Sequence, residues 1–183
     1  AMAPDPLRRR IVLFGGADAS GNTLADTWEW DGQAWQRMVP PISPRARLGH
    51  GMAYDESSGE VVMVAGADAP PYTYLSDMWS WNGSRWRQIL TASAIPVVGR
   101  LVYDSARARL VWVAGDSTTW EWIGGAWTQR ITSTVTGLSF GVAAYDAARQ
   151  QVVAFGGQRG TSLPAETWIY ESTHKASASP FGT

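Results

Sequence analysis

The stretch IVLFGG (11–16), followed by TWEW (27–30), recurs in altered form three more times along the chain. The first segment is an apolar strand that ends in glycine, with copies IVLFGG (11–16), VVMVAG (61–66), LVWVAG (110–115) and VVAFGG (152–157). The second is an aromatic strand, with copies TWEW (27–30), MWSW (78–81), TWEW (119–122) and TWIY (167–170). Regular recurrence of this kind is typical of repeat architectures. The first Trp of the aromatic strand recurs after 51, 41 and 48 residues, at Trp28, Trp79, Trp120 and Trp168. The sequence therefore predicts four related β units.

Each unit is predicted to contain two more strands. A strand that ends in Tyr-Asp precedes the apolar strand in GHGMAYD (49–55), GRLVYD (99–104) and GVAAYD (141–146). A Trp follows the last aromatic residue by five positions, at Trp35, Trp86 and Trp127. The turns before these Trp residues contain glycine, which supplies the positive φ that tight hairpins require. Each unit is therefore expected to be a four-stranded antiparallel meander.

The two end units depart from this pattern. Residues 1–16 align without a gap on residues 51–66, so the first strand of unit one looks cut short. In unit four, Lys175 occupies the place of the last Trp, and ASASPFGT (176–183) lacks strand alternation. We expect the outer strand of unit four to be missing or replaced.

The pattern of a glycine doublet, a variable loop, an aromatic strand, a tight turn and a Trp resembles the kelch repeat, as in bacterial kelch proteins and the central domain of galactose oxidase. The resemblance covers Ala1 to Tyr170 and departs from the family at Ala65 and Ala114, which replace the first glycine of the doublet. It implies an all-β fold, a β-propeller of kelch type with four four-stranded antiparallel blades, of which the first and last are incomplete. The expected blades span about 1–38, 45–89, 97–130 and 137–170, with an irregular C-terminal tail at 171–183.

Closure of the ring stays open at this point, because kelch propellers usually have six or seven blades. The chain is compatible with a compact four-bladed ring, a fragment of a larger propeller, or half of a ring completed by a second copy. Both ends fall inside a repeat, and bare flanking blades would expose apolar faces and strand edges. We therefore expect self-association as a homodimer.

Composition excludes several classes of function. Charged residues make up 17% of the chain and its formal net charge is −1, so neither nucleic acid nor an anionic membrane is an expected partner. The longest apolar runs are far shorter than the roughly 20 residues of a membrane span, and residues 1–10 lack the apolar centre of a signal peptide. We expect a soluble chain, and its compartment is not indicated.

Catalytic and metal-binding patterns are not recognisable. There is no cysteine, and the histidines are His50 and His174, which are too few for a clustered metal site. The copper site of galactose oxidase requires a cysteine, so that chemistry is excluded. Asp68, Asp116 and Glu121 could pair for glycoside hydrolysis, although a charged, solvated hairpin face explains Glu29 and Glu121 more simply. We predict no enzyme activity, no cofactor and no metal.

One end of the propeller is the predicted binding face, because loops of variable length on a rigid scaffold commonly carry function. It collects the loops between the second and third strands and the links between units. Tyr72 and Tyr74, in PPYTY (70–74), suit a protein or carbohydrate partner, although they could equally fold over blade edges. Basic residues and one histidine fall near the same end and are candidates to bind a carboxylate, although solvated arginines are the simpler alternative: Arg45, Arg47, Arg100, Arg159 and His50.

The sequence thus favours a non-catalytic module that mediates protein–protein interaction through this loop face. The alternatives are a carbohydrate-binding or carbohydrate-active propeller domain, or a fragment of a larger propeller without independent function. The paired Trp residues are expected to pack between blades rather than to bind a ligand.

Overall fold

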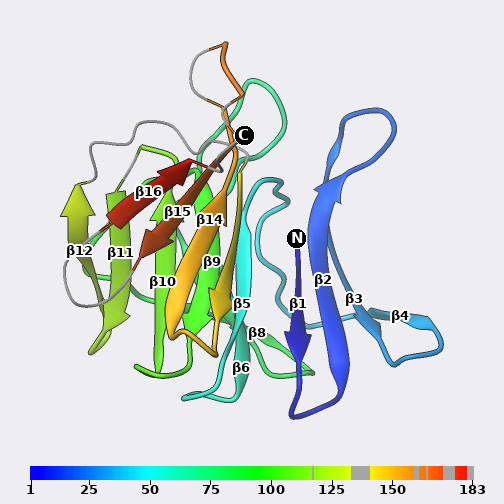
Figure 1. The fold of residues 1–183 in the computed structure, drawn as a ribbon. Coiled ribbons are helices and arrows are strands. Elements are labelled where there is room, and N and C mark those ends of the chain that lie inside the picture. Colours follow the sequence, from blue (N-terminus) through cyan, green and yellow to red (C-terminus); the bar gives the residue numbers. More distant parts are fainter. Residues whose placement is uncertain (117, 133–140, 159–160, 164, 171–175, 181–183) are drawn as a thin grey trace.

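The computed structural model describes residues 1–116, 118–132, 141–158, 161–163, 165–170 and 176–180, and these residues form only strands and loops (Figure 1). The strands make four antiparallel sheets, each in chain order. Blade 1 consists of β1 (Met2–Asp5), β2 (Arg10–Ala17), β3 (Thr23–Trp30) and β4 (Trp35–Met38). Blade 2 consists of β5 (Gly51–Asp55), β6 (Glu60–Val64), β7 (Met78–Trp81) and β8 (Trp86–Ile89). Blade 3 consists of β9 (Gly99–Asp104), β10 (Arg109–Ala114), β11 (Thr118–Ile123) and β12 (Ala126–Thr132). Blade 4 consists of β13 (Val142–Asp146), β14 (Gln151–Phe155), β15 (Glu166–Tyr170) and β16 (Ala176–Pro180). The predicted all-β propeller of four blades is confirmed.

The blades stack on one another through their first strands. β1 packs against β5, β5 against β9, and β9 against β13, whereas β13 and β1 make no contact of comparable extent. We call the side of a blade toward the preceding blade its leading face, and the side toward the following blade its trailing face. Among the described residues, two faces consequently have no neighbouring blade: the leading face of blade 1 and the trailing face of blade 4.

In blade 1, backbone conformation and steric crowding require the glycine doublet that ends the second strand. Gly15 and Gly16 have φ values of 57° and 107°, a region that side chains rarely adopt. A Cβ on Gly15 would lie 2.7 Å from the Arg47 carbonyl oxygen. Ala65, which replaces the first glycine in blade 2, takes the same conformation at φ 61°.

Tryptophans of the leading faces form the core between blades. Trp81 and Trp86 of blade 2 are buried in one cluster with Val12 and Phe14 of blade 1. Trp112 and Trp127 of blade 3 are buried against blade 2 in a second cluster. The expectation that the paired Trp residues pack between blades holds for Trp81, which is buried, and for Trp79, Trp120 and Trp122, which pack partly buried against these two clusters.

The end units differ in part from expectation. The first strand of blade 1 is present as β1, which has four residues. β16 (Ala176–Pro180) pairs with β15 where an irregular tail was expected, with Tyr170 opposite Ala176. Strand pairing needs only backbone donors and acceptors, so the absent alternation does not prevent it. The rest of the expected tail, 171–175 with Lys175 and 181–183, lies outside the described residues.

Buried polar clusters join blades 1 and 2 and, separately, blades 3 and 4. In the first, Arg8 binds both Asp5 and Glu29, and the Trp81 Nε1 of blade 2 donates to Glu29 Oε1 at 2.7 Å. We call these four residues the blade 1/2 clamp. Glu29 is buried, so the expectation of a solvated hairpin face is wrong for this residue.

The blade 3/4 clamp repeats this arrangement with Asp104, Arg107, Glu121 and Tyr170. Arg107 binds Asp104 and Glu121, and the Tyr170 hydroxyl donates to Glu121 Oε1 at 2.9 Å. Glu121 is buried, and it also accepts from two arginines of its own blade, so the solvated-face expectation is wrong here too. Burial would raise the pKa of Glu121, but its hydrogen bonds outweigh burial and lower the pKa.

The interface between blades 2 and 3 has no such clamp among the described residues. Ser58 and Ser80 of blade 2 occupy the places of the clamp arginine and glutamate. In blade 4 the corresponding residues are Arg149 and Ile169. Clamped and largely apolar interfaces therefore alternate along the chain.

The described part of the chain contains no helix that is long and apolar enough to cross a membrane.

Candidate functional site

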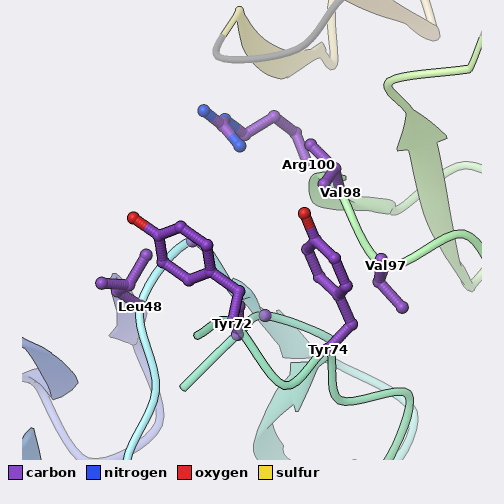
Figure 2. A pocket seen from close by; sticks show the side chains of 9 residues that line it. Leu48, Tyr72, Tyr74, Val97, Val98 and Arg100 are labelled. Carbon is purple, nitrogen blue, oxygen red and sulfur yellow. The ribbon is translucent and has the colours of Figure 1, made fainter. Parts of the chain in front are cut away.

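An open pocket of about 200 Å³ lies between blades 2 and 3, where the β6–β7 loop meets two links between blades. Figure 2 shows the side chains that form its walls. They come from the link before β5, the β6–β7 loop, the link before β9 and the start of β9: Leu48, Tyr72, Tyr74, Val97, Val98 and Arg100. We call this site the Tyr72–Tyr74 pocket.

Two exposed tyrosines dominate the opening. Tyr72 and Tyr74 keep 55% and 59% of their surface accessible, and Figure 2 shows their rings on two sides of the opening. Val97 and Leu48 supply apolar wall further along it. Rings that are apolar over their faces and polar at the hydroxyl suit contact with a protein or a sugar.

Arg100 gives the pocket a cationic side. Its Nη1 donates to the Gly99 carbonyl oxygen at 2.8 Å, and no carboxylate in the described part of the chain pairs with it. Burial lowers the pKa of Arg100 from its ordinary value, although a guanidinium stays charged at neutral pH. A half-buried cation without a carboxylate favours an anionic group in whatever the pocket binds.

The β6–β7 loop is held in place through Asp68. The Thr23 hydroxyl donates to Asp68 Oδ1 at 2.7 Å, and Arg45 forms an ion pair with Asp68 Oδ2 at 2.7 Å. The hydrogen bond from Thr23 is the main cause of a lowered pKa at Asp68. Thr23 thus ties the loop to blade 1, and Arg45, expected among the ligand-binding arginines, ties it to the link between blades 1 and 2.

Arg47, predicted as a binding residue, has a structural place in the fold. Its side chain is completely buried, and its guanidinium donates to both carboxylate oxygens of Asp77 at 2.6 and 2.8 Å. It also donates to the carbonyl oxygens of Ala65 and Arg45. The sequence signal for this role is Asp77, two residues before Trp79, because Asp77 also accepts a hydrogen bond from the Trp79 Nε1. In blade 1, Asp26 likewise accepts a hydrogen bond from the Trp28 Nε1.

His50 lines a different cavity, near the propeller axis. This axial cavity of about 370 Å³ is bounded by residues from the start of all four blades, including Met2, His50, Leu101 and Ala143. Arg100 lines both the axial cavity and the Tyr72–Tyr74 pocket. The predicted neighbourhood of His50 and Arg100 is therefore present.

The environment of His50 disfavours its charged form. The ring is buried, its Nδ1 has no hydrogen-bond partner in the described structure, and it packs edge-on against Phe14 at 5.8 Å between ring centroids. Burial, followed by the charges of the Ala1 amine and Arg47, holds the pKa of His50 well below its usual value. His50 is therefore neutral at pH 7.

Acidification is expected to destabilise the fold through His50. Because the folded-state pKa is depressed, the unfolded state binds the proton first, and stability is lost as pH falls below about 6.5. The loss approaches about 1.4 kcal/mol per pH unit while His50 stays neutral in the folded state. Urea unfolding of the wild type and of His50→Gln between about pH 7.5 and pH 5 checks this. The two free energies should draw together on acidification, and parallel curves would contradict the prediction.

Three of the seven residues predicted for binding meet in one pocket, namely Tyr72, Tyr74 and Arg100. Arg159 lies outside the described residues. Sequence reasoning missed the apolar wall at 97–98, which directly precedes the glycine that opens β9. A pair of valines in a link, rather than in a strand, was the available signal.

The acids considered for catalysis have separate places. Glu121 lies in the blade 3/4 clamp, Asp68 anchors the β6–β7 loop, and Asp116 accepts from the backbone and hydroxyl of Thr118 in a turn. Within the described ranges, no group of three or more His, Asp or Glu residues is arranged to hold a metal ion.

Comparison of the sequence with protein-family models and with curated proteins gave no match. The pocket geometry is therefore the basis for a functional proposal.

Proposed function

We propose that the chain is a kelch-type module that binds a protein partner, without catalysis, through its loop face. The Tyr72–Tyr74 pocket receives an apolar side chain of that partner, and Arg100 pairs with a carboxylate beside it. The kelch assignment is supported by the repeated glycine-ended strand, the aromatic third strand and the Trp after a tight turn. Propellers host unrelated functions, so the pocket and not the fold supports the proposal.

One observation supports it above the others: two exposed aromatic rings share a single apolar opening with Arg100, which has no carboxylate partner in the described part of the chain. Tyr and Arg are enriched among the residues that dominate binding energy at protein interfaces. The rigid anchoring of the loop at Asp68 reduces the ordering cost that a partner must overcome. An apolar residue next to an acidic residue, or next to a free C-terminal carboxylate, matches this opening.

A carbohydrate ligand is the second candidate, and the exposure of Tyr72 and Tyr74 favours it. Sugars stack on exposed aromatic rings and use polar groups at the rim. A carbohydrate gains little from Arg100 unless it carries a carboxylate, because a neutral sugar leaves the half-buried cation unpaired.

A random-peptide phage library, selected on the wild type and counter-selected on the double variant Tyr72→Ala/Tyr74→Ala, tests the proposal. We expect enriched peptides to combine a bulky apolar residue with an adjacent acid or a free C-terminus. Calorimetry with one enriched peptide should show that Tyr72→Ala and Arg100→Gln each weaken binding about tenfold or more, as removal of an interface hot spot does.

Arg87→Gln is the matched control, since Arg87 is exposed and pairs with Glu60 away from the pocket, and it should leave the affinity unchanged. Peptides that bind wild type and the double variant equally would overturn the proposal. A glycan array separates the carbohydrate alternative: reproducible binding there, lost in Tyr72→Ala/Tyr74→Ala, would replace the protein partner with a sugar.

A further inference from the structure

The leading face of blade 1 is an unpaired copy of a face that is buried in the next two blades. Trp35 aligns with Trp86 and Trp127, because each pairs across the hairpin with the last aromatic residue of its third strand. Trp35 is 43% exposed, whereas Trp86 and Trp127 are 3% and 5% exposed. Met2 on the same face is also exposed, unlike its counterpart Met52.

The trailing face of blade 4 is the opposite half of the same kind of interface. Phe155 aligns with Phe14, since each stands two residues before the second glycine of its doublet. Phe155 is 43% exposed and Phe14 is fully buried. Strand pairing places Val142 and Thr167 beside Phe155, and Ile169 beside Val153, on this face.

The interface between blades 1 and 2 shows how these two halves fit. Phe14 meets Trp86 edge-on, with ring centroids 5.3 Å apart, and the Trp86 Nε1 donates to the Thr27 hydroxyl at 2.9 Å. Thr167 occupies in blade 4 the place of Thr27 in blade 1, opposite Phe155 as Thr27 is opposite Phe14. The three participants of the contact therefore exist a second time, as Phe155, Thr167 and Trp35, and among the described residues they are not joined in such a contact.

We propose that the trailing face of blade 4 docks on the leading face of blade 1 of a second copy of this chain. In the docked pair Phe155 meets Trp35 edge-on, and the Trp35 Nε1 donates to the Thr167 hydroxyl. Ile169 takes the place of the clamp glutamate, as Ser80 does between blades 2 and 3, so the contact buries no carboxylate. The apolar type of interface thereby follows the clamped blade 3/4 interface, which preserves the alternation.

A second copy is the occupant favoured here because each chain offers both halves of the contact. Such a head-to-tail contact closes when a twofold axis relates two chains, because blade 4 of each then meets blade 1 of the other. The result is a closed ring of two chains. This inference does not depend on the proposed ligand of the Tyr72–Tyr74 pocket.

Sedimentation at high micromolar concentration provides the first test. We expect the mass of two chains of 19.9 kDa each, and a monomer for Phe155→Glu and for Trp35→Glu. Both residues are partly exposed in the single chain, so both variants should keep the far-UV spectrum of the wild type. Leu90→Glu, a change of an exposed apolar residue at the end of blade 2, should remain dimeric.

Mixing the two variants makes the test specific for a head-to-tail contact. Each variant alone carries a glutamate in both contacts of the ring. In a dimer of one Phe155→Glu chain and one Trp35→Glu chain, both glutamates lie in the same contact, and the second contact has the wild-type residues. The dimer should therefore be detected again when the two variants are mixed.

Cross-linking supplies a readout that survives if either glutamate variant unfolds. The chain has no cysteine, so Phe155→Cys and Trp35→Cys each introduce a unique thiol. A short bismaleimide should join the two variants to each other and neither variant to itself. A wild type that stays monomeric, a dimer insensitive to both glutamates, or cross-linking of one variant to itself would overturn the proposal.

Discussion

Trp112→Ala is expected to lower the free energy of unfolding by about 3–5 kcal/mol, the range for removal of a large aromatic side chain from a core. The indole is fully buried between blades 2 and 3, and its Nε1 donates to the Pro96 carbonyl oxygen at 2.9 Å. A Cβ on Gly51 or Gly99 would come within 2.6 Å of the ring. The backbone therefore fits this side chain closely, and little relaxation can fill the cavity.

Chemical denaturation, monitored by the remaining tryptophans, measures this effect. Trp112→Phe is the graded control, because it keeps an aromatic ring in the site and should lose clearly less than Trp112→Ala. Trp28→Ala, at a partly exposed position of blade 1, should also lose less. Equal losses for the three variants would show that the two glycines do not define a tightly packed site.

Glu121→Ala is the second substitution with a large expected effect, about 2–4 kcal/mol of lost stability. It removes the acceptor of Arg107, Arg109 and Arg130 and of the Tyr170 hydroxyl. Removal of one member of a buried ionic cluster leaves the remaining buried charges without a partner of opposite sign. Two of the arginines are partly exposed and regain water, which keeps the expected loss below the top of the usual range.

The matched control for this cluster is Glu60→Ala, which breaks the exposed pair with Arg87 and should cost less than about 1 kcal/mol. Near-ultraviolet absorbance adds an independent readout. Burial and the Glu121 charge raise the pKa of Tyr170 to about 12, and Glu121→Ala removes the second of these causes. Tyr170 should then ionise at lower pH in Glu121→Ala, and an unchanged titration would contradict the described clamp.

The fold could be predicted from the sequence because its information is local and repeated. The glycine-ended strand, the aromatic strand and the turn before each Trp lie within one unit, and four copies fix their phase. The outer strand of blade 4 was not predictable, because its pairing uses backbone groups and Ala176–Pro180 carries no alternation.

The clamps escaped prediction for a different reason. Glu29 and Trp81 are 52 positions apart, and Glu121 and Tyr170 are 49 apart. A glutamate between two tryptophans on a strand has the pattern of a solvated face unless the partner from the next blade is known. A long separation in sequence also hid the difference between Arg47 and Arg100, since Arg47 pairs with Asp77, which lies 30 residues away.

The pocket was partly predictable. Tyr72 and Tyr74 stand in a proline-containing loop, and Arg100 lies near the same end of its blade, so residue type and loop position were sufficient to select them. Their common opening depends on how blades 2 and 3 pack, which is a property of the whole stack rather than of any one unit.

The blade 1/2 clamp also bears on the order in which the chain is made. Asp5, Arg8 and Glu29 all belong to the first thirty residues, so their part of the cluster can assemble before the rest has been synthesised. Trp81, which completes it, leaves the ribosome about fifty residues later. We therefore expect blade 1 to present a ready acceptor to blade 2, and blade 3 to do the same for blade 4. Growth from the N-terminus would then be guided in two steps, each adding a pair of blades to the nascent protein.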